Sequence, residues 1–127
     1  MPIRIKYADD ETYIHQICEG EWTLPELREV YKETQEFIAS AQQPVAIIVD
    51  QQKSMKIPRS MMNEIRRMNQ SSHPNTQCII VVDDIPLIAT LVGALNKAYG
   101  KDEIPFFFVQ DLDAAFDLLE KQAIGDA

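Results

Sequence analysis

Basic residues are scarce in this chain, where 12 Lys and Arg stand against 20 Asp and Glu and leave a formal net charge of −8. Proteins that bind nucleic acid or anionic lipid surfaces depend on lysine and arginine to release counterions from phosphate groups. We therefore expect a protein that does not bind nucleic acid.

Long hydrophobic runs are also missing from the chain. No stretch approaches the roughly 20 apolar residues of a membrane span, and the first residues, MPIRIKYADD, lack the apolar core of a signal peptide. Cys18 and Cys78 lie in separate strand-like runs, without the CxxC spacing of metal or redox sites. We expect a soluble, cytoplasmic protein without a membrane span, in which both thiols are small buried hydrophobes.

The motifs of enzymes and cofactor sites are absent as well. The four glycines stand singly, so the sequence contains no phosphate-binding loop, dinucleotide fingerprint or nucleophile elbow. His15 and His73 lack the spacing of a zinc site, and we interpret each as a surface or edge histidine. The sequence predicts no catalytic residue, no metal and no cofactor.

What the sequence does contain is an alternation of strand-like and helix-like segments. Short continuous apolar runs are typical of strands buried on both faces, whereas apolar residues at helical spacing indicate helices with one buried face. Thr23 and Glu26 form a capping box at the start of the first helix. The expected strands are 3–7, 12–18, 45–49, 78–82 and 106–109, and the helical patterns lie within 21–43, 57–70, 85–100 and 111–122.

This order, β-β-α-β-α-β-α-β-α, predicts an α/β fold. The 127 residues are enough for one domain, which we expect to span 1–127. Strands separated by single helices form right-handed crossovers, so the sheet should be mixed but mostly parallel, with helices packed on it. The first two strands should form an antiparallel hairpin.

The acidic pair Asp83–Asp84, directly after the strand 78–82, raises the alternative of a phosphorylated receiver domain. In receivers the paired acids end the first strand, whereas here there is room for only one more strand after them. A carboxylate ahead of a helix also caps its free N–H groups, and Pro86 follows in the expected first turn. We interpret the pair as a helix cap, and Asp111 as the cap of the last helix. A receiver, or an unrecognised enzyme built on Asp50 and Asp84, is the least favoured hypothesis.

The segment 50–68 combines two unusual features. It contains four of the five methionines, and its residues 53–67 form a cluster of basic residues with a single acid, Glu64. Flexible thioethers suit an adaptable binding surface, and open α/β sheets place their sites at the carboxyl ends of strands. The alternative is that the methionines fill gaps in the core and the basic residues form a solvated face. The basic cluster comprises Lys53, Lys56, Arg59, Arg66 and Arg67, and the methionines are Met55, Met61, Met62 and Met68.

The whole chain resembles the STAS domains, the family of bacterial anti-sigma-factor antagonists and of the cytoplasmic ends of sulphate transporters. VAIIVDQQKSMKIPRS is similar to the family's strand that ends in aspartate and leads through a loop into the second helix, and FFFVQDLDAAFDLL to its final strand and helix. The resemblance implies a STAS-like α/β domain that recognises a protein or a small ligand and has no enzyme activity.

The resemblance also bears on phosphorylation. Phosphorylated members of the family read Asp-Ser-Ser-Gly where this chain has Pro58, Arg59, Ser60 and Met61. Only Ser60 matches, so Ser60 is the candidate phosphorylation site, without the aspartate and glycine of the family motif.

These observations together predict a non-catalytic regulatory or interaction module that binds the acidic surface of a protein partner through residues 50–68. The alternative is a small anionic, amphipathic or lipid ligand, held between the second helix and the sheet. A homodimer is compatible with either hypothesis. The residues predicted to contact the partner or ligand are Lys53, Ser54, Met55, Lys56, Arg59, Ser60, Met62 and Arg66.

Overall fold

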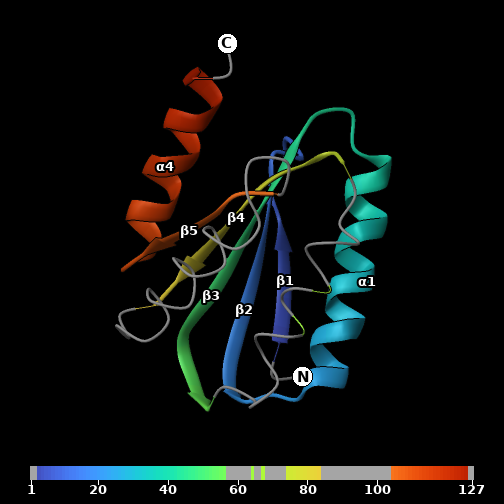
Figure 1. Cartoon of the computed structure of the whole chain (residues 1–127), viewed down its shortest axis with the longest axis vertical. Coiled ribbons are helices and arrows are strands. Elements are labelled where there is room, and N and C mark those ends of the chain that lie inside the picture. Colours follow the sequence, from blue (N-terminus) through green and yellow to red (C-terminus); the bar gives the residue numbers. More distant parts are fainter. Residues whose placement is uncertain (1–2, 57–63, 65–66, 68–73, 84–103, 126–127) are drawn as a thin grey trace.

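The fold is built on one sheet, whose strands follow one another in space in the order of the sequence (Figure 1). The computed structural model describes residues 3–56, 64, 67, 74–83 and 104–125. Its described elements are β1 (Ile3–Tyr7), β2 (Tyr13–Glu21), α1 (Leu24–Ser40), β3 (Val45–Lys56), β4 (Thr76–Val82), β5 (Phe106–Val109) and α4 (Leu112–Gly125). The α/β class and the mostly parallel sheet are therefore confirmed.

The first two strands form the predicted hairpin. β1 and β2 pair antiparallel from Ile3↔Cys18 to Tyr7↔Ile14, whereas β2–β3, β3–β4 and β4–β5 are all parallel. The turn between β1 and β2 is tight, and Glu11 adopts a left-handed backbone conformation (φ 62°). One reversal of chain direction is thus followed by three crossovers, as the alternating pattern predicts.

Two strands run further than the sequence analysis predicted. β2 continues to Glu21 instead of ending at Cys18, and β3 continues to Lys56 instead of ending at Val49. The predicted loop after Asp50 is therefore wrong for residues 51–56. The physical reason is that the two extensions pair with each other, through Glu19↔Lys53 and Glu21↔Lys56. Such pairing supplies hydrogen bonds to a segment whose own side chains carry no strand pattern.

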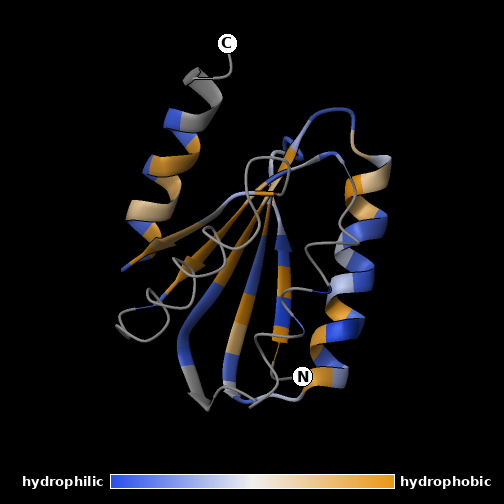
Figure 2. Cartoon of the chain, in the orientation of Figure 1, coloured by the Kyte–Doolittle hydropathy of each residue, from blue (hydrophilic) through white to orange (hydrophobic). Residues whose placement is uncertain are grey.

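Alternation along β3 divides the core between the two faces of the sheet. Ile47 packs with Ile38 of α1 on one face, while Ile48 packs with Ala115 of α4 on the other. Figure 2 shows the first half of β3, with β4 and β5, as the most hydrophobic part of the sheet, whereas β3 becomes hydrophilic further along. Neither described helix is long and apolar enough to cross a membrane.

Thr23 and Asp111 cap the two described helices as predicted, although Glu26 contacts the Thr23 hydroxyl and not the backbone N–H that a capping box would use. The Glu26 backbone N–H donates to Thr23 Oγ1 (3.4 Å), and the Thr23 hydroxyl donates to Glu26 Oε1 (3.0 Å). At α4 the Ala114 N–H donates to Asp111 Oδ1 at 2.8 Å. Each carboxylate also lies near the positive end of its helix dipole.

Asp83, the other predicted cap, follows β4 directly and is buried. Its backbone N–H donates to the Val109 carbonyl at 3.0 Å, which extends the pairing of β4 with β5. Asp84 and the expected helix within 85–100 lie outside the described residues, so capping by this acidic pair stays a prediction.

The cap of α4 provides a test of stability. Asp111→Ala removes the acceptor for the Ala114 N–H and should lower the free energy of unfolding by about 1 kcal/mol, as measured by urea denaturation. Asp117→Ala, at an exposed position within the same helix, is the matched control and should change it by less than about 0.5 kcal/mol. Equal losses in the two variants would show that Asp111 does not cap the helix.

Both cysteines are fully buried and neither forms a disulfide, as the sequence predicted for small buried hydrophobes. Burial, reinforced by the nearby Asp50 carboxylate, raises the pKa of the Cys18 thiol to about 12. The thiolate is the reactive form, so Cys18 should be inert in the folded protein at pH 8.

Thiol titration with a disulfide reagent at pH 8 should therefore proceed on the order of a hundredfold more slowly in the folded protein than in guanidinium chloride. Both thiols should react once the chain is unfolded. Rapid modification of Cys18 in the folded protein, located by peptide mapping, would contradict the packing described here.

Candidate functional site

The structure describes part of the segment 50–68 that the sequence singled out. Lys53 is exposed on β3, and Ser54, Met55 and Lys56 continue the same strand. Of the other predicted contact residues, Arg59, Ser60, Met62 and Arg66 lie outside the described residues. The described part of the predicted site is therefore the last part of the strand β3.

The end of β3 extends beyond its neighbour on one side. The last pair between β3 and β4 is Asp50↔Val82, whereas pairing with β2 continues to Glu21↔Lys56. Figure 1 shows β2 and β3 running well past the end of β4. We call this two-stranded extension, residues 18–21 of β2 and 51–56 of β3, the β2–β3 arm. Within the described chain, no strand pairs with the β4-side edge of the arm.

The β2–β3 arm is irregular in a way that favours a bend or twist. Its strand register shifts twice, and Gly20 of β2 lies between the two shifts. Gly20 has φ +60°, a conformation that glycine adopts without steric cost. Such bulges increase local twist and re-aim the side chains beyond them. β3 has one extra residue relative to β2 at two points, between Ile17↔Asp50 and Glu19↔Lys53 and between Gly20↔Ser54 and Glu21↔Lys56.

Acidic residues of β2 lie opposite the basic residues of the arm. Glu19 faces Lys53 and Glu21 faces Lys56 in the strand register, and Arg4 of β1 forms an ion pair with Glu19. The hydrogen bond from Arg4, with a smaller contribution from Lys53, holds the pKa of the Glu19 carboxyl below its usual range. Two further acids, Glu19 and Glu21, therefore lie on the strand next to the basic cluster, which has only Glu64 within its own stretch of sequence.

The base of the arm contains buried polar side chains. His15 Nε2 lies 3.2 Å from Asp50 Oδ2, and Asp50 Oδ1 accepts a hydrogen bond from the Gln52 backbone N–H at 3.1 Å. Gln51 Nε2 donates to Cys18 Sγ at 3.4 Å. These contacts join β2 to β3 where the apolar part of β3 ends, and they give Asp50 a structural role.

The interpretation of His15 as a surface or edge histidine is wrong. Only 8% of the residue is exposed and its ring meets Asp50, so His15 is not a surface residue, and β2 lies between β1 and β3, so it is not on an edge strand. The signal that could have found this contact is Asp50 itself, an acid at the end of a buried run that needs a polar partner. His73 lies outside the described residues.

Glu64, the single acid within residues 53–67, is buried and bound to arginines. Arg28 of α1 donates to both of its carboxylate oxygens, from Nε at 3.2 Å and from a terminal nitrogen at 2.5 Å, and an Arg67 nitrogen lies 3.6 Å from Oε1. The bond from Arg28 lowers the pKa of Glu64. Glu64 is thus bound to Arg28 of α1, and it also pairs with Arg67, a member of the basic cluster predicted from the sequence.

No group of three or more His, Cys, Asp or Glu side chains that could hold a metal ion occurs among the residues described. The proposed ligand pocket between the second helix and the sheet involves residues outside that part of the chain. What the structure brings together is therefore an extended strand end, on which Lys53 is exposed, and a buried polar base.

Comparison with known proteins identifies the fold. No protein-family model and no curated protein matches the chain. Among solved structures, the chain is similar to an uncharacterized protein of the DUF3478 family from Shewanella loihica PV-4, described as having a SpoIIAA-like fold. The TM-score is 0.67 at 14% sequence identity, and the match covers 92% of this chain and 91% of the other. The protein therefore has a SpoIIAA-like, STAS-like fold over nearly its whole length.

Proposed function

We propose that the protein is a non-catalytic regulatory or interaction module of the STAS type, which binds an acidic surface of a protein partner through residues 50–68. The observation that carries the proposal is the β2–β3 arm. A charged strand end that extends past the sheet is a recognition element, because it presents main-chain groups and side chains together.

The main chain of the arm contributes the first part of the interaction. Residues 51–56 are in strand conformation, and no described strand pairs with their β4-side edge. Such an edge can accept an extended segment of a partner as an additional strand, with hydrogen bonds independent of the partner's sequence. Ser54 lies within this stretch and joins the contact.

Charge contributes the second part. Glu19 offsets the charge of Lys53 only in part, since Glu19 also forms an ion pair with Arg4. With Arg59 and Arg66 added, the segment is the most basic region of an acidic chain. A basic patch of this kind accelerates association with acidic surfaces and disfavours basic ones. Met55 and Met62 then supply adaptable apolar contact.

Ser60 lies within the same proposed surface, next to Arg59 in the sequence. A phosphate there would add about two negative charges to a region that otherwise attracts acids. Phosphorylation of Ser60 would therefore oppose the docking of an acidic partner and provides a route to regulation.

The proposal predicts that reversing two charges weakens partner binding. Affinity-tagged wild-type protein and the double variant Lys53→Glu/Arg59→Glu are used to capture partners from a lysate of the organism's own cells, with crosslinking and mass spectrometry for identification. The partner should be recovered about tenfold less by the variant, and raising the salt concentration should also reduce its capture by the wild type.

The matched control is Lys32→Glu, which reverses an exposed charge on α1. It should capture the partner as the wild type does, and circular dichroism should show the same fold for all three proteins. Undiminished capture by the double variant would refute docking through this segment.

A further inference from the structure

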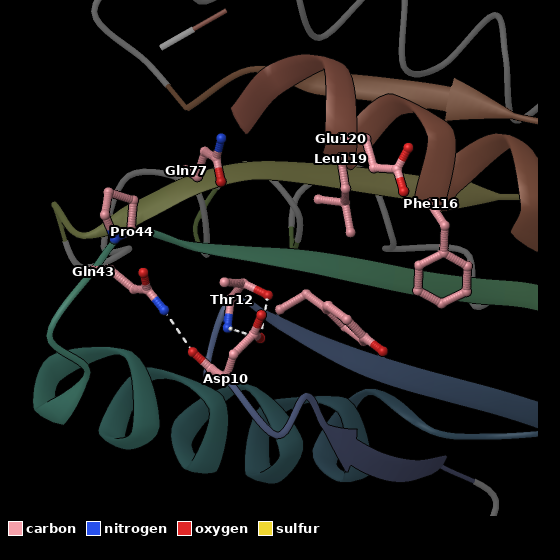
Figure 3. Close-up of a pocket in the computed structure, with 9 residues that line it drawn as sticks. Asp10, Thr12, Gln43, Pro44, Gln77, Phe116, Leu119 and Glu120 are labelled. Carbon is pink, nitrogen blue, oxygen red and sulfur yellow. Dashed lines mark hydrogen bonds between the residues drawn. The ribbon is translucent and has the colours of Figure 1, made fainter. Parts of the chain in front are cut away.

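A second concave region lies at the opposite end of the sheet from the β2–β3 arm. It is a pocket of about 540 Å³, formed where the turn before β2, the segment before β3 and the start of β4 face the helix α4. Figure 3 shows side chains of α4 extending toward the strands, with Asp10 and Thr12 on the facing turn. Its volume falls within the roughly 300–1,000 Å³ typical of small-molecule sites.

One part of this pocket is apolar. Tyr13 and Phe116 meet edge to face, with ring centroids 5.3 Å apart and an interplanar angle of 65°. Leu119, one helical turn after Phe116, and Pro44, just before β3, complete the apolar walls. Aromatic rings in this arrangement offer both apolar contact and a negative π face to a bound molecule.

The other part of the pocket is negatively charged. Asp10 and Glu120 line it from opposite sides, and none of the described lining residues is basic. Neither carboxylate forms an ion pair with a described residue, so both charges are available to a ligand. Asp9 and Glu11 flank Asp10 in the turn and add to the negative potential.

The turn that carries Asp10 is held in place by several hydrogen bonds. Asp10 Oδ1 accepts from the Thr12 backbone N–H at 3.1 Å and from the Thr12 hydroxyl at 2.6 Å, and Gln43 Nε2 donates to the Asp10 carbonyl at 2.5 Å. The bonds from Thr12 lower the pKa of Asp10, so the carboxylate is ionised near neutral pH. The charge is thus positioned before any ligand arrives.

From this geometry we propose that the pocket binds a small organic cation with an apolar body, such as an arylalkyl amine. The ammonium group lies between Asp10 and Glu120, and the apolar body packs on Phe116, Leu119 and Tyr13. Anions of the same shape are rejected by the two carboxylates. The site is separate from the proposed docking segment, so either can fail without the other.

Three probes that share an aromatic body and differ in charge test the proposal. Phenethylamine, 2-phenylethanol and 3-phenylpropionate are titrated into isotope-labelled protein, and amide chemical shifts are followed by NMR. Phenethylamine should perturb the amides of Thr12, Tyr13, Leu119 and Glu120 and bind more tightly than the neutral alcohol. The anionic probe should bind most weakly.

Neutralising variants locate the charge that acts. Asp10→Asn keeps an oxygen acceptor for Thr12 and removes the charge, and Glu120→Gln does the same on α4. Each should weaken phenethylamine binding about two- to fivefold, the range of one exposed ion pair, and leave binding of 2-phenylethanol unchanged. Glu36→Gln, at an exposed position on α1, is the matched control and should bind as the wild type does.

Three results would overturn the proposal. They are equal affinities for the amine and the alcohol, chemical shift changes confined to residues away from the pocket, and unaltered amine binding in the Asp10→Asn/Glu120→Gln double variant. An amine that binds the wild type and loses its advantage over the alcohol in the double variant would establish the site.

Discussion

The parallel pairing of β3 with β2 is the constraint on which the rest of the structure depends. β3 is the middle strand of the sheet, and its partner β2 also forms the antiparallel pair with β1, the one such pair among the described strands. The register between the two strands decides which side chains of β3 face α1 and which face α4. A shift by one residue would exchange Ile47 and Ile48 between the two cores.

The same pairing explains where the core ends and the arm begins. Up to Asp50 the strand is apolar on both faces and is flanked by β2 and β4. Asp50 is the last residue of β3 that pairs with β4. From there the buried residues are polar: Asp50 contacts His15, and Gln51 donates a hydrogen bond to Cys18. A buried carboxylate left without a partner would cost several kcal/mol, so this contact specifies the position of β2 against β3 as well as stabilising it.

Most of the scaffold could be predicted from the sequence, because it is determined by local patterns. Apolar runs located the core of β3, β4 and β5, and the side-chain oxygens of Thr23 and Asp111 marked the starts of α1 and α4. The resemblance to STAS domains gave the same architecture, which the similarity to a SpoIIAA-like structure supports.

The environment of the candidate site could not be predicted in the same way, because it depends on residues distant in sequence. Residues 51–56 carry no strand pattern and are ordered by Glu19 to Glu21, about thirty positions earlier. Arg28 of α1 binds Glu64, 36 positions later in the chain. The burial of His15 depends on its contact with Asp50, 35 positions later in the sequence, which no local pattern around His15 shows. The sequence shows which charged residues are present, whereas the register of neighbouring strands decides which opposite charges lie beside them.

The agreement between strand order and chain order has a consequence for synthesis. Each strand pairs with the one that leaves the ribosome next, so the sheet can be completed in order, from the hairpin onward, without inserting a late strand between earlier ones. α1 reaches its face of the sheet early, whereas α4 follows all the other described elements in the chain. The apolar residues of β3 and β4 that pack with Ala115 are synthesised before α4, so their contact with this helix can form only after all the described strands have been made.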